Sequence, residues 1–205
     1  MNLRAPLALL GAALLLAACS STTAGTPSPA PSSSTAPASR VPPYAGAPKV
    51  ENPLPDSVLA GDPCQALTQE QIVSDVGPGI TGKQESASGF GPTCDWPDSD
   101  AGSLLTVSFM TGQKLGLSAL YDQTRKLMKR FDVLPPVQGY PAVAYDDHPG
   151  PQSPSCQTAV GISDTLRFEI GVELGAANRD KTDACRITTA VAGQVLTTLM
   201  QKAGR

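Results

Sequence analysis

The chain is poor in the residues that enzymes most often use for acid–base and nucleophilic chemistry. Its 205 residues include a single histidine, a single tryptophan and five cysteines. Ser118 and Ser163 lie nearest to a Gly-x-Ser-x-Gly pattern, but neither has its second glycine, so the nucleophile elbow of α/β-hydrolases is missing from the sequence. So little material for a conventional catalytic site favours a non-enzymatic function.

The chain also lacks a dense basic cluster. Lysine and arginine gather only at Lys126, Lys129 and Arg130, and the formal net charge is −3. Nucleic-acid binding surfaces are strongly basic, so we do not expect a nucleic-acid partner. The three basic residues fall near the end of a predicted helix, where the helix dipole favours cations.

No apolar run is long enough to cross a bilayer as a permanent helix. The run from Leu7 to Leu16 follows Arg4 and is shorter than the roughly 20 residues that a membrane helix needs. Residues 1–18 therefore have the pattern of a secretory signal peptide. Leu16-Ala17-Ala18-Cys19 resembles a bacterial lipobox, so we expect lipid on Cys19, which also accounts for the odd cysteine. This predicts a lipid-anchored protein on the extracytoplasmic face of the cell membrane.

A change in composition marks the predicted domain boundary. Residues 19–50 are rich in proline, serine, threonine and alanine and poor in large apolar side chains, which is typical of a disordered tether. Residues 51–205 are long enough for one globular domain with a core of its own.

The apolar periodicity of residues 51–205 predicts an α+β fold. Helical signals begin at Asp62-Pro63 and at the capping box from Thr68 to Gln71. Spacing of three and four predicts helices over residues 117–131 and after Thr182 or Asp183, whereas period-two patterns predict strands over 105–109, 142–145, 156–162 and 166–174. In the last of these we expect one apolar and one solvated face. The order predicts an antiparallel sheet covered by helices.

Four cysteines remain in the predicted domain: Cys64, Cys94, Cys156 and Cys185. Outside the cytoplasm they are expected to form two disulfides, for which three connectivities exist. We favour Cys64 with Cys94 and Cys156 with Cys185, because each pair joins a helix start to a strand start within its own half. A four-cysteine metal site is disfavoured because no Cys-x-x-Cys spacing occurs.

An ordered set of short motifs resembles a known family. The lipobox and tether precede Asp62-Pro63-Cys64, Cys94-Asp95-Trp96, Gly139-Tyr140-Pro141-Ala142 and Asp183-Ala184-Cys185. This set resembles actinobacterial lipoproteins of the domain of unknown function 3558 family. The resemblance implies location and architecture, including a possible similarity to the PsbP-like or Mog1-like α/β/α sandwich, and it implies no activity.

Asp146, Asp147 and His148 form the only acidic and imidazole cluster that suggests a polar site. A carboxylate-oriented base is conceivable there, but aspartate and the following prolines favour a polar turn. Asp95, Asp98 and Asp100 resemble half of a calcium loop, but Gly102 comes one place late, so a hairpin turn is the better interpretation. Trp96 and Tyr140 are interpreted first as packing residues. No metal and no cofactor are predicted.

Three functions follow from these patterns. The leading hypothesis is a membrane-anchored, non-enzymatic module that binds a partner protein or an envelope ligand. The alternative is a carrier of a small apolar ligand or lipid, with a cavity built from Phe109, Leu120, Phe168 and Leu199. A hydrolase using His148 ranks last.

Overall fold

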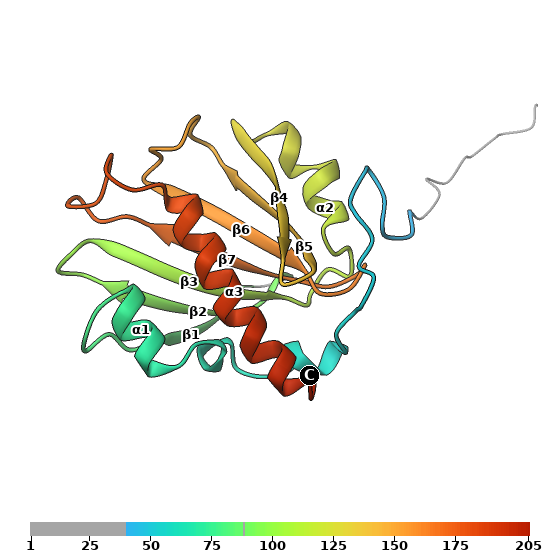
Figure 1. The fold of residues 1–205 in the computed structure, drawn as a ribbon, viewed down its shortest axis with the longest axis horizontal. Helices are drawn as coiled ribbons and strands as arrows, with labels where there is room; N and C mark the ends of the chain where they lie inside the picture. The colour runs from blue at the N-terminus through green and yellow to red at the C-terminus, as the bar shows by residue number, and fades with distance from the viewer. Residues whose placement is uncertain (1–39, 88) are drawn as a thin grey trace, which may run out of the picture. The chain divides into compact units, whose positions relative to one another are not determined.

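A seven-stranded antiparallel sheet forms the centre of the computed structural model, which describes residues 40–87 and 89–205. The spatial order is β1-β2-β3-β7-β6-β5-β4 (Figure 1). The strands are β1 Lys83–Ala87, β2 Gly91–Asp98, β3 Ser103–Met110, β4 Arg130–Val137, β5 Tyr140–Asp146, β6 Ser155–Gly161 and β7 Arg167–Glu173. The predicted α+β class is confirmed. The closer analogy to PsbP-like or Mog1-like sandwiches stays a prediction.

The predictions for the signal peptide, for Cys19 and for the tether up to residue 39 lie outside the described residues. Within residues 40–87 and 89–205, no helix has both the length and the apolar character that crossing a membrane requires.

Three α-helices and three short 3₁₀ helices accompany the sheet. They are α1 Gln69–Asp75, α2 Ser118–Asp122, α3 Ala184–Lys202, η1 Asp56–Leu59, η2 Pro63–Ala66 and η3 Thr124–Lys126. The predicted capping box is present, because the Thr68 side chain accepts the Gln71 backbone N–H and the Gln71 side chain accepts the Thr68 N–H. Asp183 caps α3 by accepting the Cys185 backbone N–H. These local signals fix where the two helices begin.

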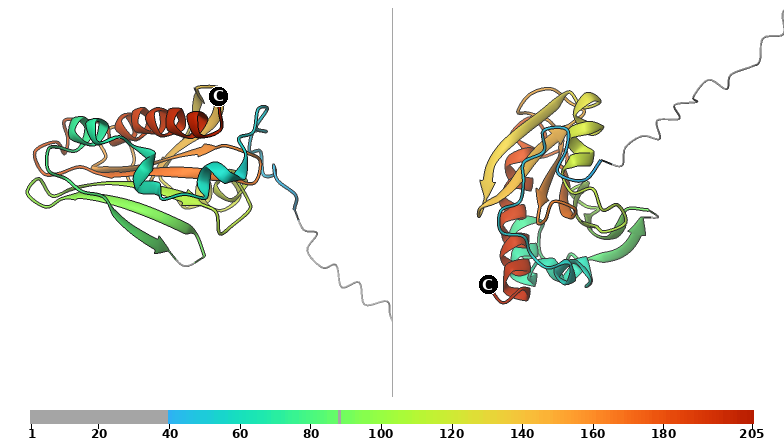
Figure 2. Two further views of the ribbon diagram at one scale, coloured as in Figure 1. Left: turned by 90° about the horizontal axis from the view of Figure 1, so that it is seen from below. Right: turned by 90° about the vertical axis from the view of Figure 1, so that its right-hand side faces the viewer.

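One face of the sheet is covered by α1 and α3, and the main core lies between these helices and the sheet (Figure 2, left). Period-two alternation brings Phe109 and Phe168 directly opposite each other on this face, and both are fully buried with Leu199 of α3. Leu120 instead belongs to a second cluster around α2. The four residues proposed to surround an apolar cavity therefore pack into two separate clusters.

The other face of the sheet is covered only at one end. There α2 packs its Leu120 and Tyr121 against Val143, Tyr145 and Ala159. The segment 40–50, which the composition assigns to the tether, also lies against this part of the molecule. The Tyr44 N–H donates to Ser118 Oγ at 3.0 Å and the Val50 N–H to Asp164 Oδ1 at 2.8 Å. The packed domain thus includes residues before the expected boundary at residue 51.

The helix predicted over residues 117–131 is wrong in its second half. It ends at Asp122, η3 follows, and Arg130 begins β4. Phe131 pairs with Tyr145 across the β4–β5 ladder, and its ring meets Tyr121 edge-on at 5.3 Å between centroids. Sheet pairing and aromatic packing override the helical spacing of this segment. Lys126 ends η3, whereas Lys129 lies before β4 and Arg130 begins it, so the predicted helix end is wrong for Lys129 and Arg130.

Candidate functional site: a polar hollow on the open face of the sheet

The uncovered part of the second face is built from three neighbouring strands. Thr106 of β3 and Gln157 of β6 both pair with Gly171 of β7, so the three residues form one row across the sheet. Gly171 has no side chain, and a Cβ at this position would lie 3.1 Å from the Gln157 amide nitrogen. Because Gly171 has no side chain, the sheet surface is depressed at the middle of this row, and the Gln157 side chain lies over the depression.

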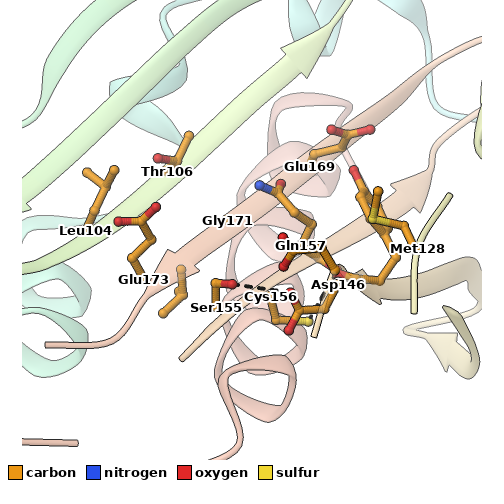
Figure 3. A pocket seen from close by; sticks show the side chains of 13 residues that line it. Leu104, Thr106, Met128, Asp146, Ser155, Cys156, Gln157, Glu169, Gly171 and Glu173 are labelled. Carbon is orange, nitrogen blue, oxygen red and sulfur yellow. Dashed lines mark hydrogen bonds between the residues drawn. The ribbon is translucent and has the colours of Figure 1, made fainter. Parts of the chain in front are cut away.

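This row forms part of a hollow of about 460 Å³ (Figure 3). The apolar part of its wall comes from Leu104, Met128, Tyr145 and Val172. No lysine or arginine of the described chain lines the hollow. The polar part of the wall includes four carboxylates, which belong to Asp146, Asp147, Glu169 and Glu173. The volume lies in the range of about 300–1,000 Å³ that is usual for ligand sites.

Glu169 is held by a buried ion pair beside the hollow. Arg167 Nε lies 2.6 Å from Glu169 Oε1, and Arg167 Nη1 donates to the Gly116 carbonyl at 2.8 Å. The side chains of Arg167 and Glu169 are 4% and 11% exposed, so the fully solvated face predicted for this strand is wrong at these two positions. Burial, and then the negative charge of Glu169, raise the pKa of Tyr145 well above 10.0. The network joins the sheet to the start of α2.

Asp146, Asp147 and His148 lie together where β5 ends, as their adjacency predicts. His148 Nδ1 is 2.6 Å from Asp147 Oδ1 and 3.5 Å from Asp146 Oδ1. Candidate ligand atoms of all three residues lie within 4.8 Å of one another, so this is the place in the described chain where a cation could be held by imidazole and carboxylate together. The His148 and Asp147 side chains are 51% and 70% exposed, as expected for a polar turn.

Asp146 differs from its two neighbours because its side chain is only 3% exposed. Its Oδ1 accepts a hydrogen bond from Ser155 Oγ at 3.2 Å, whereas its buried Oδ2 has no hydrogen-bond partner within the described residues. Burial raises the pKa of Asp146, but the Ser153 hydroxyl and other nearby polar groups outweigh burial and lower it below 3.8. The carboxylate is therefore ionised and buried, and only one of its two oxygens accepts a hydrogen bond. A buried oxygen without a partner lowers the stability of the fold unless a donor or a cation binds to it.

The arrangement does not assemble a hydrolase triad within the described part of the chain. The Ser155 hydroxyl donates to Asp146 and not to His148. Among residues 40–87 and 89–205, no hydroxyl is hydrogen-bonded to the imidazole. A nucleophile activated by His148 would need such a bond or a short approach to it.

The other acidic candidates do not converge. Asp98 Oδ1 accepts the backbone N–H groups of Asp100 and Ala101 and so closes the β2–β3 turn, while Asp95 accepts the Thr106 hydroxyl at 2.8 Å. The hairpin interpretation of this segment is confirmed. Trp96 and Tyr140 are 3% and 5% exposed, respectively, so both are packing residues, as expected.

Both favoured disulfides are present. Cys64 bonds to Cys94, which joins η2 to β2, and Cys156 bonds to Cys185, which joins β6 to the start of α3. Cys156 also contributes to the wall of the hollow, although its disulfide to Cys185 joins the sheet to α3 on the opposite face. The sequence holds one signal for the hollow, Glu169-x-Gly171-x-Glu173, which places two carboxylates on either side of a glycine on one strand face.

Comparisons with known proteins give a family and no activity. No curated protein and no solved structure matches the chain. Residues 14–198 match a family described as "Protein of unknown function (DUF3558)", which spans the predicted lipobox, the described sheet and most of α3. The resemblance drawn from the cysteine and turn motifs is thereby confirmed, and the chain belongs to the DUF3558 family.

Proposed function

We propose that this protein is a non-enzymatic binding module, held by lipid on Cys19 at the extracytoplasmic face of a cell membrane. Its proposed role is to bind a partner protein of the cell envelope through the open face of the sheet. The tether proposed for the residues after Cys19 would let the domain reach a partner away from the lipid surface.

The single observation that carries this proposal is the unequal covering of the two sheet faces. The face toward α3 is closed by a continuous apolar core. The opposite face keeps the polar hollow open over β3, β7, β6 and the end of β5. A sheet face that is neither packed nor uniformly solvated is a natural place for a partner surface.

Site-specific photocrosslinking in living cells tests this proposal. A photoreactive amino acid replaces Gln157, which is exposed in the hollow, or Arg186, which is exposed on α3, in the full-length chain. We expect position 157, and not position 186, to give a discrete adduct with one envelope protein. Equal labelling from both positions, or no protein adduct from position 157, would contradict binding through the open face.

A further inference from the structure

We propose that the hollow binds an extended, positively charged peptide segment of the partner, with two lysine or arginine side chains four residues apart. This inference rests on the proposed function and names the chemistry of the surface that the partner must present.

The charge of the hollow supports a cationic ligand. Its wall has four carboxylates and no lysine or arginine. Arg167, which lies on the same face of β7, neutralises Glu169, but Glu173 makes no ion pair with any residue of the described chain. A cationic side chain entering the hollow therefore meets at least one uncompensated charge and no basic residue of the wall.

An independent observation points in the same direction. Asp146 is nine-tenths buried, lines the hollow and leaves its Oδ2 without a donor among the described residues. Native structures rarely leave a buried carboxylate oxygen unpaired, because its lost hydration is not repaid. Because Oδ2 itself is buried from solvent, an N–H donor of a bound peptide completes this group only after the Asp146 side chain turns toward the hollow.

The spacing of the carboxylates favours an extended peptide. Glu169 and Glu173 lie on the same face of β7 with Gly171 between them. Four residues of strand span about 13 Å, which is also the distance between side chains at positions i and i+4 of an extended peptide. Figure 3 shows the two carboxylates toward opposite ends of the hollow, with Gln157 between them. One small cation cannot reach both ends, whereas two side chains of one peptide can, one pairing with Glu173 and the other sharing Glu169 with Arg167.

The apolar part of the wall suits the stems of such side chains. Leu104 and Met128 line the hollow beside the carboxylates. Lysine and arginine bury their methylene stems on apolar surface while the charged end meets an acceptor. The wall thus matches long cationic side chains better than a hydrated metal ion.

Fluorescence anisotropy with the purified full-length protein tests the inference. The probe is a short labelled peptide of threonine and glycine with lysines at positions i and i+4, and the comparison peptides carry glutamate at both positions or adjacent lysines. We expect the i, i+4 lysine peptide to bind at least tenfold more tightly than the glutamate peptide and more tightly than the adjacent-lysine peptide. Binding should weaken as salt is raised from about 50 to 300 mM, because the contacts are ionic.

Charge variants locate the binding. Glu173→Gln should weaken the lysine peptide about threefold to fivefold, and Glu173→Lys tenfold or more. The matched control is Glu51→Lys, which makes the same charge change at an exposed residue outside the hollow and should leave the affinity unchanged. Both residues are exposed, so neither substitution disturbs the core.

Three results would overturn the inference: equal affinity for lysine and glutamate peptides, equal loss from Glu173→Lys and Glu51→Lys, or complete displacement of the peptide by equimolar spermidine or Ca²⁺. The last result would identify a small-cation site. If the crosslink from position 157 still captured one envelope protein, the proposed binding function would stand and only the cationic nature of the partner surface would fail.

Discussion

At the scale of single residues, Asp146 has the most unusual environment at the hollow. Its side chain is 3% exposed and its pKa is lowered, because the surrounding polar groups outweigh the effect of burial. A carboxyl group with a lowered pKa in the folded state stabilises the fold above its unfolded pKa, and that contribution is lost as the pH falls through the folded pKa.

We therefore expect Asp146→Asn to reduce the acid sensitivity of the fold. Between pH 5 and pH 3, the free energy of unfolding of the wild type should fall more steeply than that of the variant, measured by urea unfolding at each pH. Asp100→Asn is the matched control, because Asp100 is exposed and lies outside the hollow, and it should keep the wild-type slope. Equal slopes for the wild type and Asp146→Asn would contradict the assignment.

Residue-level chemistry was the most predictable part of this molecule. Thr68 and Asp183 act as helix caps, and the four cysteines pair as favoured, because each depends on a local signal or on order along the chain. The unpartnered oxygen of Asp146 was not predictable, since its burial depends on how the loop after β5 folds back on Ser155.

At the scale of elements, Asp183 joins α3 to the edge of the sheet. Its Oδ1 accepts the Cys185 N–H at 3.0 Å, and the same carboxylate lies 3.0 Å from Arg130 Nη1 at the start of β4. Asp183 thus has two separable roles, a cap and an ion pair.

Substitution of Asp183 separates these roles. Asp183→Ala should lower the free energy of unfolding by about 1–2 kcal/mol, because both contacts are lost and a helix cap is worth about that much. Asp183→Asn keeps a capping oxygen but loses the charge opposite Arg130, so it should cost only about 0.5 kcal/mol. Chemical denaturation monitored by circular dichroism measures both values. A loss of equal size in the two variants would show that the ion pair dominates.

Element types were predictable where the period was clean and were wrong where two patterns overlapped. The period-two run in β7 and the apolar stripe of α3 both predict the element that the structure has. In residues 117–131 helical spacing was also present, but Phe131 and Val133 alternate as strand residues and pair with Tyr145 and Val143 of β5. That pairing depends on a distant strand, which local spacing does not contain.

At the scale of the whole molecule, the proposed anchor determines where the domain works. Cys19→Ala should move the protein from the membrane fraction to the soluble extracytoplasmic fraction, because the acyl chains supply the membrane affinity. Ser20→Ala changes the next residue and leaves the thiol, so it should keep the protein at the membrane. Fractionation and immunoblotting of both variants measure this. Cys19→Ala protein that remained in the membrane fraction after its signal peptide had been removed would contradict lipidation as the anchor.

The general architecture was predictable from the order of elements, but the open face was not. Composition and periodicity indicated an antiparallel sheet with helices. They did not indicate that α1 and α3 share one face, because this depends on the crossover that places β7 beside β3. The alternation of β7 similarly predicts that Arg167 and Glu169 are exposed to solvent. Both side chains are buried because α2 packs there.

The two disulfides join cysteines that are consecutive along the domain, the first with the second and the third with the fourth. In a chain exported amino-terminus first, Cys94 would emerge while Cys64 is the only free thiol of the domain, and Cys185 would emerge when Cys156 is the only one left. Each correct pair then forms without competition from a wrong one. Such a chain needs an oxidase during export, but it does not depend on an isomerase to correct its disulfides.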